Sequence, residues 1–382
     1  MGPRGTALPA GSFVDAAATG DGVLATLQSG VVHLPNDWLR DNCPCPECRI
    51  VQTDERRRQP WLDSDAPTVA AVAVVGEELH LTWVDGHQTA YTTDSWARIR
   101  TAASRGEYTV TLWTGDYQLG RFEHDAVLAD ADTHRRMFEA FRRDGAVVVT
   151  DAPREPGTVV DFARSIGLTL IDSSLGFIFD VKVDPAGYNV AFTSEGLPPH
   201  NDNAQYSHPP SGQILSMLVN EASGGDSIVV DGWCVLEQLQ ALDPAAVDVL
   251  SRVEVGFRQY SSHADGFSRN PVVRRDVHGR FNHLRFSNQL MQPLPFDHPD
   301  LAEWYRAYRM LGRLVSERAN QVRFRLHGGD MLFVNGYRAL HARTAFQTDG
   351  PRHLQDVYFS TDDVHSAIAR LTGEATNAMV HS

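Results

Sequence analysis

The segment His200-Asn201-Asp202 and the distant His341 contain the residue types of a mononuclear iron site. Two imidazoles and one carboxylate on one face of an octahedron bind non-haem Fe(II) and leave positions open. A bidentate 2-oxo acid and O2 can fill those positions. His200 and Asp202 are two residues apart, so on a strand both side chains would point to the same face. The sequence therefore predicts an iron centre with His200, Asp202 and His341 as its ligands.

Arg352 follows His341 closely in the sequence and comes directly before the strand pattern of residues 353–359. Its guanidinium is a planar fork of N–H donors that matches a carboxylate. His341 itself follows the buried strand pattern 331–335, which a Gly-Asp turn opens. We therefore expect the metal ligands and Arg352 on neighbouring strands, with Arg352 binding the distal carboxylate of 2-oxoglutarate.

A single histidine is more often a hydrogen-bonded surface or core residue than a metal ligand. The chain has 16 histidines, and the competitors for the iron site are His208, His263, His283 and His353. The rigid extended segment before His200 and the strand before His341 favour these two residues over the competitors.

Three of the four cysteines, Cys43, Cys45 and Cys48, are close together in the sequence. Disulfides between such close cysteines would be strained and would leave one cysteine unpaired. Three thiolates in a tight turn are instead typical of a zinc site that takes its fourth ligand from elsewhere. His87, in a predicted turn, is the expected fourth ligand, and His80 is the alternative. Such a closed site would be structural, because no position remains for a substrate.

Length and net charge favour a globular protein with a large core and argue against a nucleic-acid-binding protein. The chain has 382 residues and a formal net charge of −14. The length allows two domains and a large core, and the acidic balance argues against nucleic acid as a partner. No apolar run approaches a transmembrane span, and the first residues lack the apolar segment of a secretory signal. We therefore expect a cytoplasmic globular enzyme that acts on a small molecule, without a membrane partner.

The hydrophobic patterns predict a mainly β chain with helices, an α+β organisation in two domains. Residues 1–115 are expected to form the small zinc-binding domain. Its predicted elements are short strands within 21–34, a hairpin of 69–75 and 78–83, and a helix over 92–104. Residues 107–125 are predicted to be a connector.

Residues 116–382 are expected to form a double-stranded β-helix, the jelly-roll type, because many strands occur with few βαβ units. Helices are predicted over 133–143, 158–166, 235–250 (with a break at Asp243-Pro244) and 299–318. Strands are predicted over 146–149, 176–183, 187–193, 213–220, 226–230, 253–260, 271–275, 280–287, 321–326, 331–335 and 355–360.

Three segments resemble the γ-butyrobetaine hydroxylase and trimethyllysine hydroxylase family, within the taurine-dioxygenase-like oxygenases. They are the zinc motif Trp38–Cys48, Gly224-Gly225-Asp226-Ser227, and Leu340-His341-Ala342-Arg343. The resemblance implies Fe(II)- and 2-oxoglutarate-dependent hydroxylation of an unactivated C–H bond, with release of succinate and CO2. It also implies a small zwitterionic or quaternary-ammonium substrate, O2 as cosubstrate, ascorbate as a possible reductant, and a homodimer.

The resemblance also implies roles for individual residues. Ser227 would lie near the 2-oxoglutarate carboxylate. The positions of the family's aromatic cage for a trimethylammonium group are Leu175, Phe179, Phe192 and Tyr358, and those for the polar end of the substrate are Asn189 and Asn288. Leu175 departs from the aromatic pattern and would remove part of the cation–π attraction.

Other functions stay open at this point. The same oxygenase chemistry could act on a non-betaine amino acid, a phosphonate or a secondary metabolite, with desaturation or cyclisation as outcomes. A zinc-dependent hydrolase could use the same ligands, but it would leave Arg352 without a role. A non-catalytic scaffold would have no need of an intact set of ligands.

Overall fold

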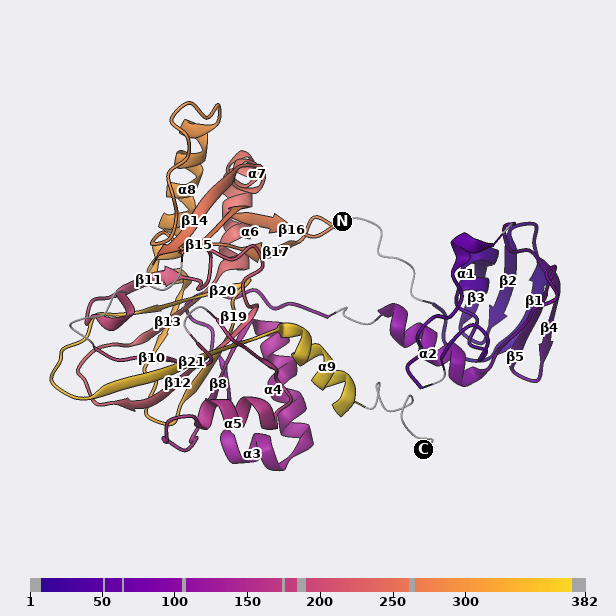
Figure 1. Ribbon diagram of the computed structural model, residues 1–382, viewed down its shortest axis with the longest axis horizontal. Helices are drawn as coiled ribbons and strands as arrows, with labels where there is room; N and C mark the ends of the chain where they lie inside the picture. The colour runs from indigo at the N-terminus through magenta and orange to yellow at the C-terminus, as the bar shows by residue number, and fades with distance from the viewer. Residues whose placement is uncertain are drawn as a thin grey trace. The chain divides into compact units, whose positions relative to one another are not determined.

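The computed structural model describes residues 8–50, 52–63, 65–104, 108–173, 176–183, 190–260 and 265–372. Contacts divide the chain into two compact units, whose described parts are residues 8–104 and 108–372 (Figure 1). The break falls within the segment 107–125 that was predicted to be a connector. The assignment of domains to 1–115 and 116–382 stays a prediction.

Two three-stranded antiparallel sheets build the smaller unit. The first contains β1 (Phe13–Ala18), β2 (Gly22–Leu27) and β3 (Gly30–Pro35). The second contains β4 (Val69–Val75), β5 (Glu78–Trp83) and β6 (Gln88–Tyr91), so the predicted hairpin is confirmed. The helical segments are α1 (Asn36–Asp41), η1 (Pro60–Leu62) and α2 (Thr93–Ser104). The core of this unit draws on both sheets and both α-helices, with Phe13, Leu34, Leu39, Leu81, Trp83 and Trp96 among its buried residues.

The larger unit contains a seven-stranded sheet in the order β10-β21-β12-β19-β8-β7, with β9 also paired to β21. Every pair is antiparallel except β7 with β8. The strands are β7 (Gly120–Glu123), β8 (Ala146–Thr150), β9 (Leu170–Ile171), β10 (Phe179–Val181), β12 (Gly212–Asn220), β19 (Met331–Asn335) and β21 (Arg352–Phe359).

A four-stranded antiparallel sheet faces one side of this large sheet. Its order is β11-β20-β13-β18, with β11 (Leu197–His200), β13 (Ser227–Asp231), β18 (Gln321–Phe324) and β20 (Ala339–Arg343). One buried cluster joins Leu215 and Leu354 of the large sheet to Val229 and Val322 of the small one. The two sheets therefore pack face to face, with apolar side chains between them.

Helices cover the other side of the large sheet (Figure 1). They are α3 (His124–Ala129), α4 (Ala131–Asp144), α5 (Thr158–Ser165) and α9 (Thr361–Leu371). Phe141 of α4 and Phe162 of α5 pack with Phe333 of β19 in one core cluster. The neighbouring residue Leu332 belongs to the cluster between the sheets, as the alternation of side chains along a strand requires.

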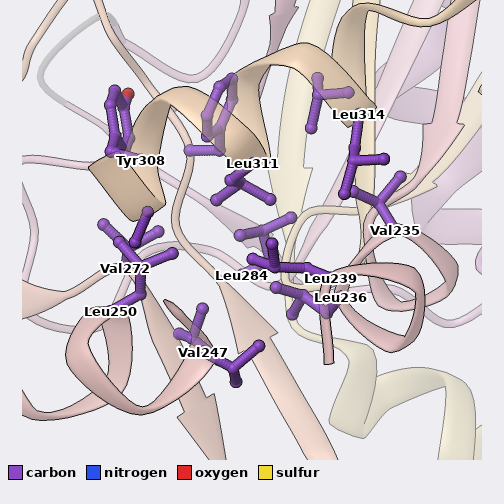
Figure 2. Close-up of a cluster of buried hydrophobic side chains, with 14 of the residues drawn as sticks. Val235, Leu236, Leu239, Val247, Leu250, Val272, Leu284, Tyr308, Leu311 and Leu314 are labelled. Carbon is purple, nitrogen blue, oxygen red and sulfur yellow. The ribbon is translucent and has the colours of Figure 1, made fainter. Parts of the chain in front are cut away.

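A third core cluster lies among the remaining helices and two hairpins (Figure 2). The helices are α6 (Gly232–Leu242), α7 (Pro244–Arg252) and α8 (Leu301–Ser316), and η3 (Arg318–Asn320) follows. The hairpins pair β14 (Glu254–Tyr260) with β15 (Asp265–Pro271), and β16 (Val273–Arg275) with β17 (Phe281–Leu284). The predicted break between α6 and α7 is confirmed, because Asp243 caps α7 and Pro244 is its first residue. Across the described residues, no helix combines the length and apolar composition that spanning a bilayer requires.

Three sequence predictions need correction. Residues 107–125 are not only a connector, because they contain β7 and the start of α3. Of the strand predicted at 187–193, residues 187–189 lie outside the described residues, and Val190–Phe192 form the 3-10 helix η2. The predicted strand ranges omitted β20 (Ala339–Arg343), although His341 was expected on a strand next to the other ligands.

Candidate active site and metal sites

The iron-ligand candidates come together where β11 meets β20. His200 and His341 are direct partners across these antiparallel strands. One ligand atom from each of His200, Asp202 and His341 lies within 4.8 Å of the others. Asp202 Oδ1 is 3.3 Å from His200 Nε2, and Asp202 Oδ2 is 3.8 Å from His341 Nε2. The donor set and its convergence fit a facial triad for Fe(II).

Asp202 reaches this site by a route other than the predicted one. β11 ends at His200, so Asp202 does not share a strand face with it, and the same-face prediction was wrong. Asp202 lies in a bend, and the next residue, Asn203, has a left-handed φ of 57°. The bend turns the carboxylate back towards the two imidazoles.

Asn201 fixes this bend. Its backbone N–H donates to Phe286 O at 3.0 Å, and its side-chain oxygen accepts from Phe286 N at 2.9 Å. Its amide nitrogen donates to the carbonyls of Leu284 and Gly336. Asn201 is buried, and its full set of hydrogen bonds holds the two flanking ligands in place. Sequence reasoning missed this role, although a polar residue between two ligands was a visible signal.

The ionisation states of Asp202 and His341 suit metal binding. Burial alone would raise the pKa of the Asp202 carboxyl, but His341, His200 and Tyr358 hold it well below its usual range. Burial and the neighbouring His200 lower the pKa of His341 to about 4, so this imidazole is neutral at pH 7. His200 Nδ1 lies 2.8 Å from Pro198 O. Because a carbonyl only accepts, Nδ1 carries the proton and Nε2 faces the site.

Two further side chains orient the Asp202 carboxylate. Gln213 Nε2 donates to Asp202 Oδ2 at 2.8 Å, and the Tyr358 hydroxyl lies 2.9 Å from the same oxygen. Both donors come from inward-facing positions of the large sheet, where β12 and β21 pair at Gln213 and Tyr358. Gln213 was not singled out from the sequence, because its burial arises only once these strands pair.

A cavity of about 150 Å³ opens on the triad. Its lining includes His200, Asp202, His341, Ser227, Arg352, Phe179 and Tyr358. Four alternate residues of β21 face it, namely Arg352, Leu354, Asp356 and Tyr358. The structure therefore brings the predicted metal ligands, Ser227 and Arg352 into one chamber between the two sheets.

Arg352 is a partly buried cation without a carboxylate partner among the described residues. Its Nε has no hydrogen-bond partner there, and its guanidinium lies 5.1 Å from the centre of the Phe346 ring. Burial and the nearby Arg343 and Arg325 lower its pKa to about 10, so it remains charged at pH 7. An anion entering the cavity would supply the missing partner, as the distal carboxylate of 2-oxoglutarate would.

Arg343, the other arginine of the cavity, is already engaged. Its guanidinium donates to the backbone carbonyls of Ala191, Thr193 and Glu195. These bonds tie the segment around η2 to β20. Arg343 Nε is unpaired as well, but both Nη atoms of Arg343 are bonded, so Arg352 keeps more free N–H donors for an anion.

Only some of the predicted substrate-binding residues line the cavity. Phe179 lines the cavity, and Phe192 packs against it with ring centres 5.4 Å apart. Tyr358 lines the cavity, but its hydroxyl is within hydrogen-bonding distance of Asp202 and Asp356. Leu175 and Asn189 lie outside the described residues.

Asn288 is not brought to the cavity. It is exposed, and its side-chain oxygen accepts from Tyr308 OH at 3.5 Å. Its neighbours Ser287 and Gln289 line the cavity in its place. The local match therefore selected a side chain that does not line the cavity, between two polar residues that do.

A second group of candidate metal ligands lies in the smaller unit. His87 Nε2 is 3.4, 3.6 and 3.7 Å from the sulfur atoms of Cys43, Cys45 and Cys48. In a tetrahedral zinc site, Zn–S and Zn–N bonds of standard length put sulfur and nitrogen about 3.6 Å apart. The four ligand atoms therefore fit zinc. His80, the alternative, instead pairs with Glu78 at 3.2 Å.

Neighbouring donors support this cysteine cluster. Thr89 Oγ1 donates to Cys43 Sγ at 3.1 Å, and Arg40 Nη1 donates to Cys48 Sγ at 3.2 Å. Burial raises the pKa of the Cys43 thiol to about 12. A bound dication offsets this penalty by stabilising the thiolates.

Comparison with known proteins agrees with this geometry. The family model described as taurine catabolism dioxygenase TauD, TfdA family, matches residues 116–358. The model described as gamma-butyrobetaine hydroxylase-like, N-terminal, matches residues 27–99. The chain belongs to the TauD/TfdA family and is a 2-oxoglutarate-dependent dioxygenase.

Curated relatives extend over nearly the whole chain. The gamma-butyrobetaine dioxygenase of Pseudomonas sp. (strain AK-1) is 33% identical over 93% of this chain and 95% of its own. The gamma-butyrobetaine dioxygenase of Homo sapiens is 25% identical over 90% of this chain and 92% of its own. The mitochondrial trimethyllysine dioxygenase of Rattus norvegicus is 25% identical over 90% and 84%.

Proposed function

We propose that this dioxygenase hydroxylates an unactivated C–H bond of a small zwitterionic or quaternary-ammonium substrate, at an iron ion held by His200, Asp202 and His341. One observation carries the proposal: a single cavity is lined by the three ligand candidates, the unpaired Arg352 and the aromatic residues Phe179 and Tyr358. The names of the relatives, gamma-butyrobetaine and trimethyllysine dioxygenase, support a substrate with an alkylated nitrogen.

Different residues of the cavity bind the 2-oxoglutarate, bind the substrate and exclude water. Fe(II) with 2-oxoglutarate and O2, when bound, supplies the oxidising chemistry and releases succinate and CO2. Arg352 binds the distal carboxylate of 2-oxoglutarate through its free donors, and Ser227 lines the same cavity from β13 of the facing sheet. Phe179 and Tyr358 offer ring faces to a cationic head group. The apolar packing between the two sheets keeps bulk water from the reacting atoms.

We also propose a double-stranded β-helix for the larger unit and a structural zinc ion for the smaller one. The two facing sheets, with metal ligands on the smaller one and its connections, support a double-stranded β-helix. The sulfur–nitrogen distances support one structural zinc ion held by Cys43, Cys45, Cys48 and His87. A homodimer and ascorbate as reductant stay predictions from the family resemblance, and the cytoplasmic location stays a prediction from the sequence.

Turnover of 2-oxoglutarate against a panel of small substrates tests the proposed function. The panel contains γ-butyrobetaine, its less methylated analogues, trimethyllysine, amino acids and phosphonates. We expect at least one alkylated-nitrogen zwitterion to stimulate succinate release well above the rate without substrate. Stimulation only by phosphonates or by compounds without nitrogen would reject the proposed substrate class while leaving the oxygenase chemistry intact.

Arg352→Lys should weaken the apparent affinity for 2-oxoglutarate by about tenfold or more, because it keeps the charge but loses the paired N–H donors. The dependence of succinate formation on 2-oxoglutarate concentration measures this effect. Arg343→Lys is the comparison variant, since Arg343 binds backbone carbonyls and its loss should act mainly on stability. Normal 2-oxoglutarate dependence in Arg352→Lys, with impairment in Arg343→Lys, would transfer the role to Arg343.

Phe192→Ala should weaken substrate binding by about two- to thirtyfold, through loss of a ring that supports the Phe179 face. Binding of 2-oxoglutarate should be unchanged, because Arg352 lies elsewhere in the cavity. Phe296→Ala is the matched control, as that ring is 90% exposed. Equal substrate affinity in Phe192→Ala and the control would return Phe192 to a role in core packing.

A further inference from the structure

Asp356 is a buried carboxylate in the cavity wall that neither the metal site nor the 2-oxoglutarate site uses. It lies four residues after Arg352 on β21, and both side chains face the chamber. Four residues of an extended strand span about 13 Å, so the strand places an anion-binding group and a carboxylate at separate points of one wall. Asp356 is 2% exposed.

The two carboxylate oxygens of Asp356 have different surroundings. Oδ2 accepts from Gln213 Nε2 at 2.7 Å and lies 2.9 Å from the Tyr358 hydroxyl. The same two donors reach Asp202 Oδ2, so Asp356 lies directly behind the metal-ligand candidate. Oδ1 is buried and has no hydrogen-bond partner among the described residues. No described arginine, lysine or histidine forms an ion pair with Asp356.

The neighbours of Asp356 form a site for a nitrogen cation. Phe179 on β10 and Leu215 on β12 are its direct partners on the two adjacent strands, and both line the cavity. A carboxylate oxygen beside an aromatic ring and an aliphatic side chain suits an ammonium group that carries alkyl substituents.

The unpaired oxygen restricts which cation fits. A buried acceptor without a donor is costly, and Oδ1 accepts whether the carboxyl is ionised or carries its proton on Oδ2. A tertiary, secondary or primary ammonium group has an N–H to donate. A quaternary ammonium group has none, so it would leave Oδ1 without a hydrogen bond.

We propose that Asp356 is a specificity-determining residue whose Oδ1 accepts a hydrogen bond from an N–H group of the substrate. The cavity therefore prefers a zwitterion with an incompletely alkylated nitrogen over one with a trimethylated nitrogen. This inference rests on the proposed function and narrows its substrate class.

Two probes that differ by one methyl group test the proposal. They are γ-butyrobetaine and the N,N-dimethyl derivative of γ-aminobutyrate, which is protonated and has one N–H at neutral pH. Dissociation constants by calorimetry and kcat/KM from succinate release are measured for each with the intact holoenzyme. The wild-type protein should prefer the N–H probe by about tenfold or more, as a hydrogen bond to a charged group implies.

Asp356→Asn is the decisive variant. Gln213 and Tyr358 hold the remaining oxygen at the Oδ2 position, so the new amide nitrogen takes the Oδ1 position and offers a donor in place of an acceptor. The preference for the N–H probe should fall to about one or below, with little change in volume. Asp248→Asn, at an exposed aspartate of α7 outside the cavity lining, is the control and should keep the wild-type ratio.

Three outcomes would overturn the proposal: a wild-type preference for γ-butyrobetaine, a wild-type ratio retained in Asp356→Asn, or no binding of either probe. A retained ratio would leave Asp356 only the role of orienting Gln213 and Tyr358. If neither probe binds but another substrate drives succinate release, the inference fails and the oxygenase function stands. If no compound drives 2-oxoglutarate consumption, the proposed function itself fails.

Discussion

Asp202→Ala is expected to reduce substrate-dependent succinate release to background. The change removes the only carboxylate of the proposed iron site, and the two imidazoles that remain do not complete a facial triad. It also leaves Gln213 and Tyr358 without the acceptor that they share on Asp202. Iron content after anaerobic reconstitution should fall together with turnover, which separates loss of metal from loss of substrate binding.

Asp248→Ala is the matched control for this experiment. Asp248 is exposed on α7 and pairs with Arg252 one helical turn away, so its loss costs only about 0.3–0.5 kcal/mol. It should keep wild-type iron content and turnover. Substrate-dependent succinate release at the wild-type rate in Asp202→Ala would remove Asp202 from the iron site.

Removing zinc is expected to unfold the smaller unit. In zinc-finger peptides the metal contributes about 10–16 kcal/mol at pH 7, which is as large as the whole stability of a typical domain at about 5–15 kcal/mol. Cys48→Ser, or a strong chelator, should therefore abolish the folded state of residues 8–104. Elemental analysis and thermal unfolding monitored by the tryptophans of this unit, Trp38, Trp83 and Trp96 among them, measure the effect.

The chain offers controls for both kinds of ligand. Cys234→Ser changes the one cysteine outside the cluster and should keep both zinc content and stability. His80→Ala should behave in the same way, because His80 pairs with Glu78. His87→Ala should lose zinc. Stoichiometric zinc in His87→Ala, or folded wild-type protein without zinc, would refute the proposed ligand set.

The candidate ligands of the two metal sites could be predicted from the sequence, because their residue types rarely occur together by chance. Three close cysteines, an H-x-D segment and an arginine before a strand point to particular chemistry wherever they lie in space. Direct pairing of His200 with His341 could not be predicted in this way. It depends on β20, a five-residue strand whose pattern, Ala-Leu-His-Ala-Arg, is too short and too mixed to stand out.

Residues that act through burial were missed for a physical reason. Gln213 and Asp356 are common polar residues, and nothing in the local sequence shows that they are enclosed. Asn201 is marked in the sequence only by its position between two ligands. Their roles appear only when β12 pairs with β21 and when the bend after β11 meets Phe286. Asn288 shows the opposite error, since a local match selected a side chain that the fold leaves exposed.

Helices and hairpins with strong local signals were easier to predict. The Asp243-Pro244 break and the hairpin of β4 and β5 were confirmed because capping and turn residues fix them locally. The 3-10 helix η2 replaces part of a predicted strand, and its neighbourhood is held by Arg343 from far along the chain. Such tertiary control overrides the local propensity of an apolar segment.

Turnover under isotope-labelled O2 with the most active substrate tests the central claim most directly. A 2-oxoglutarate-dependent hydroxylase should place label from O2 in both the succinate and the hydroxylated product, with succinate and product formed in equal amounts. Mass spectrometry of the two compounds reads out both quantities. Label that enters the product only from water, without succinate, would contradict the account and would instead indicate hydrolysis at the same three ligands.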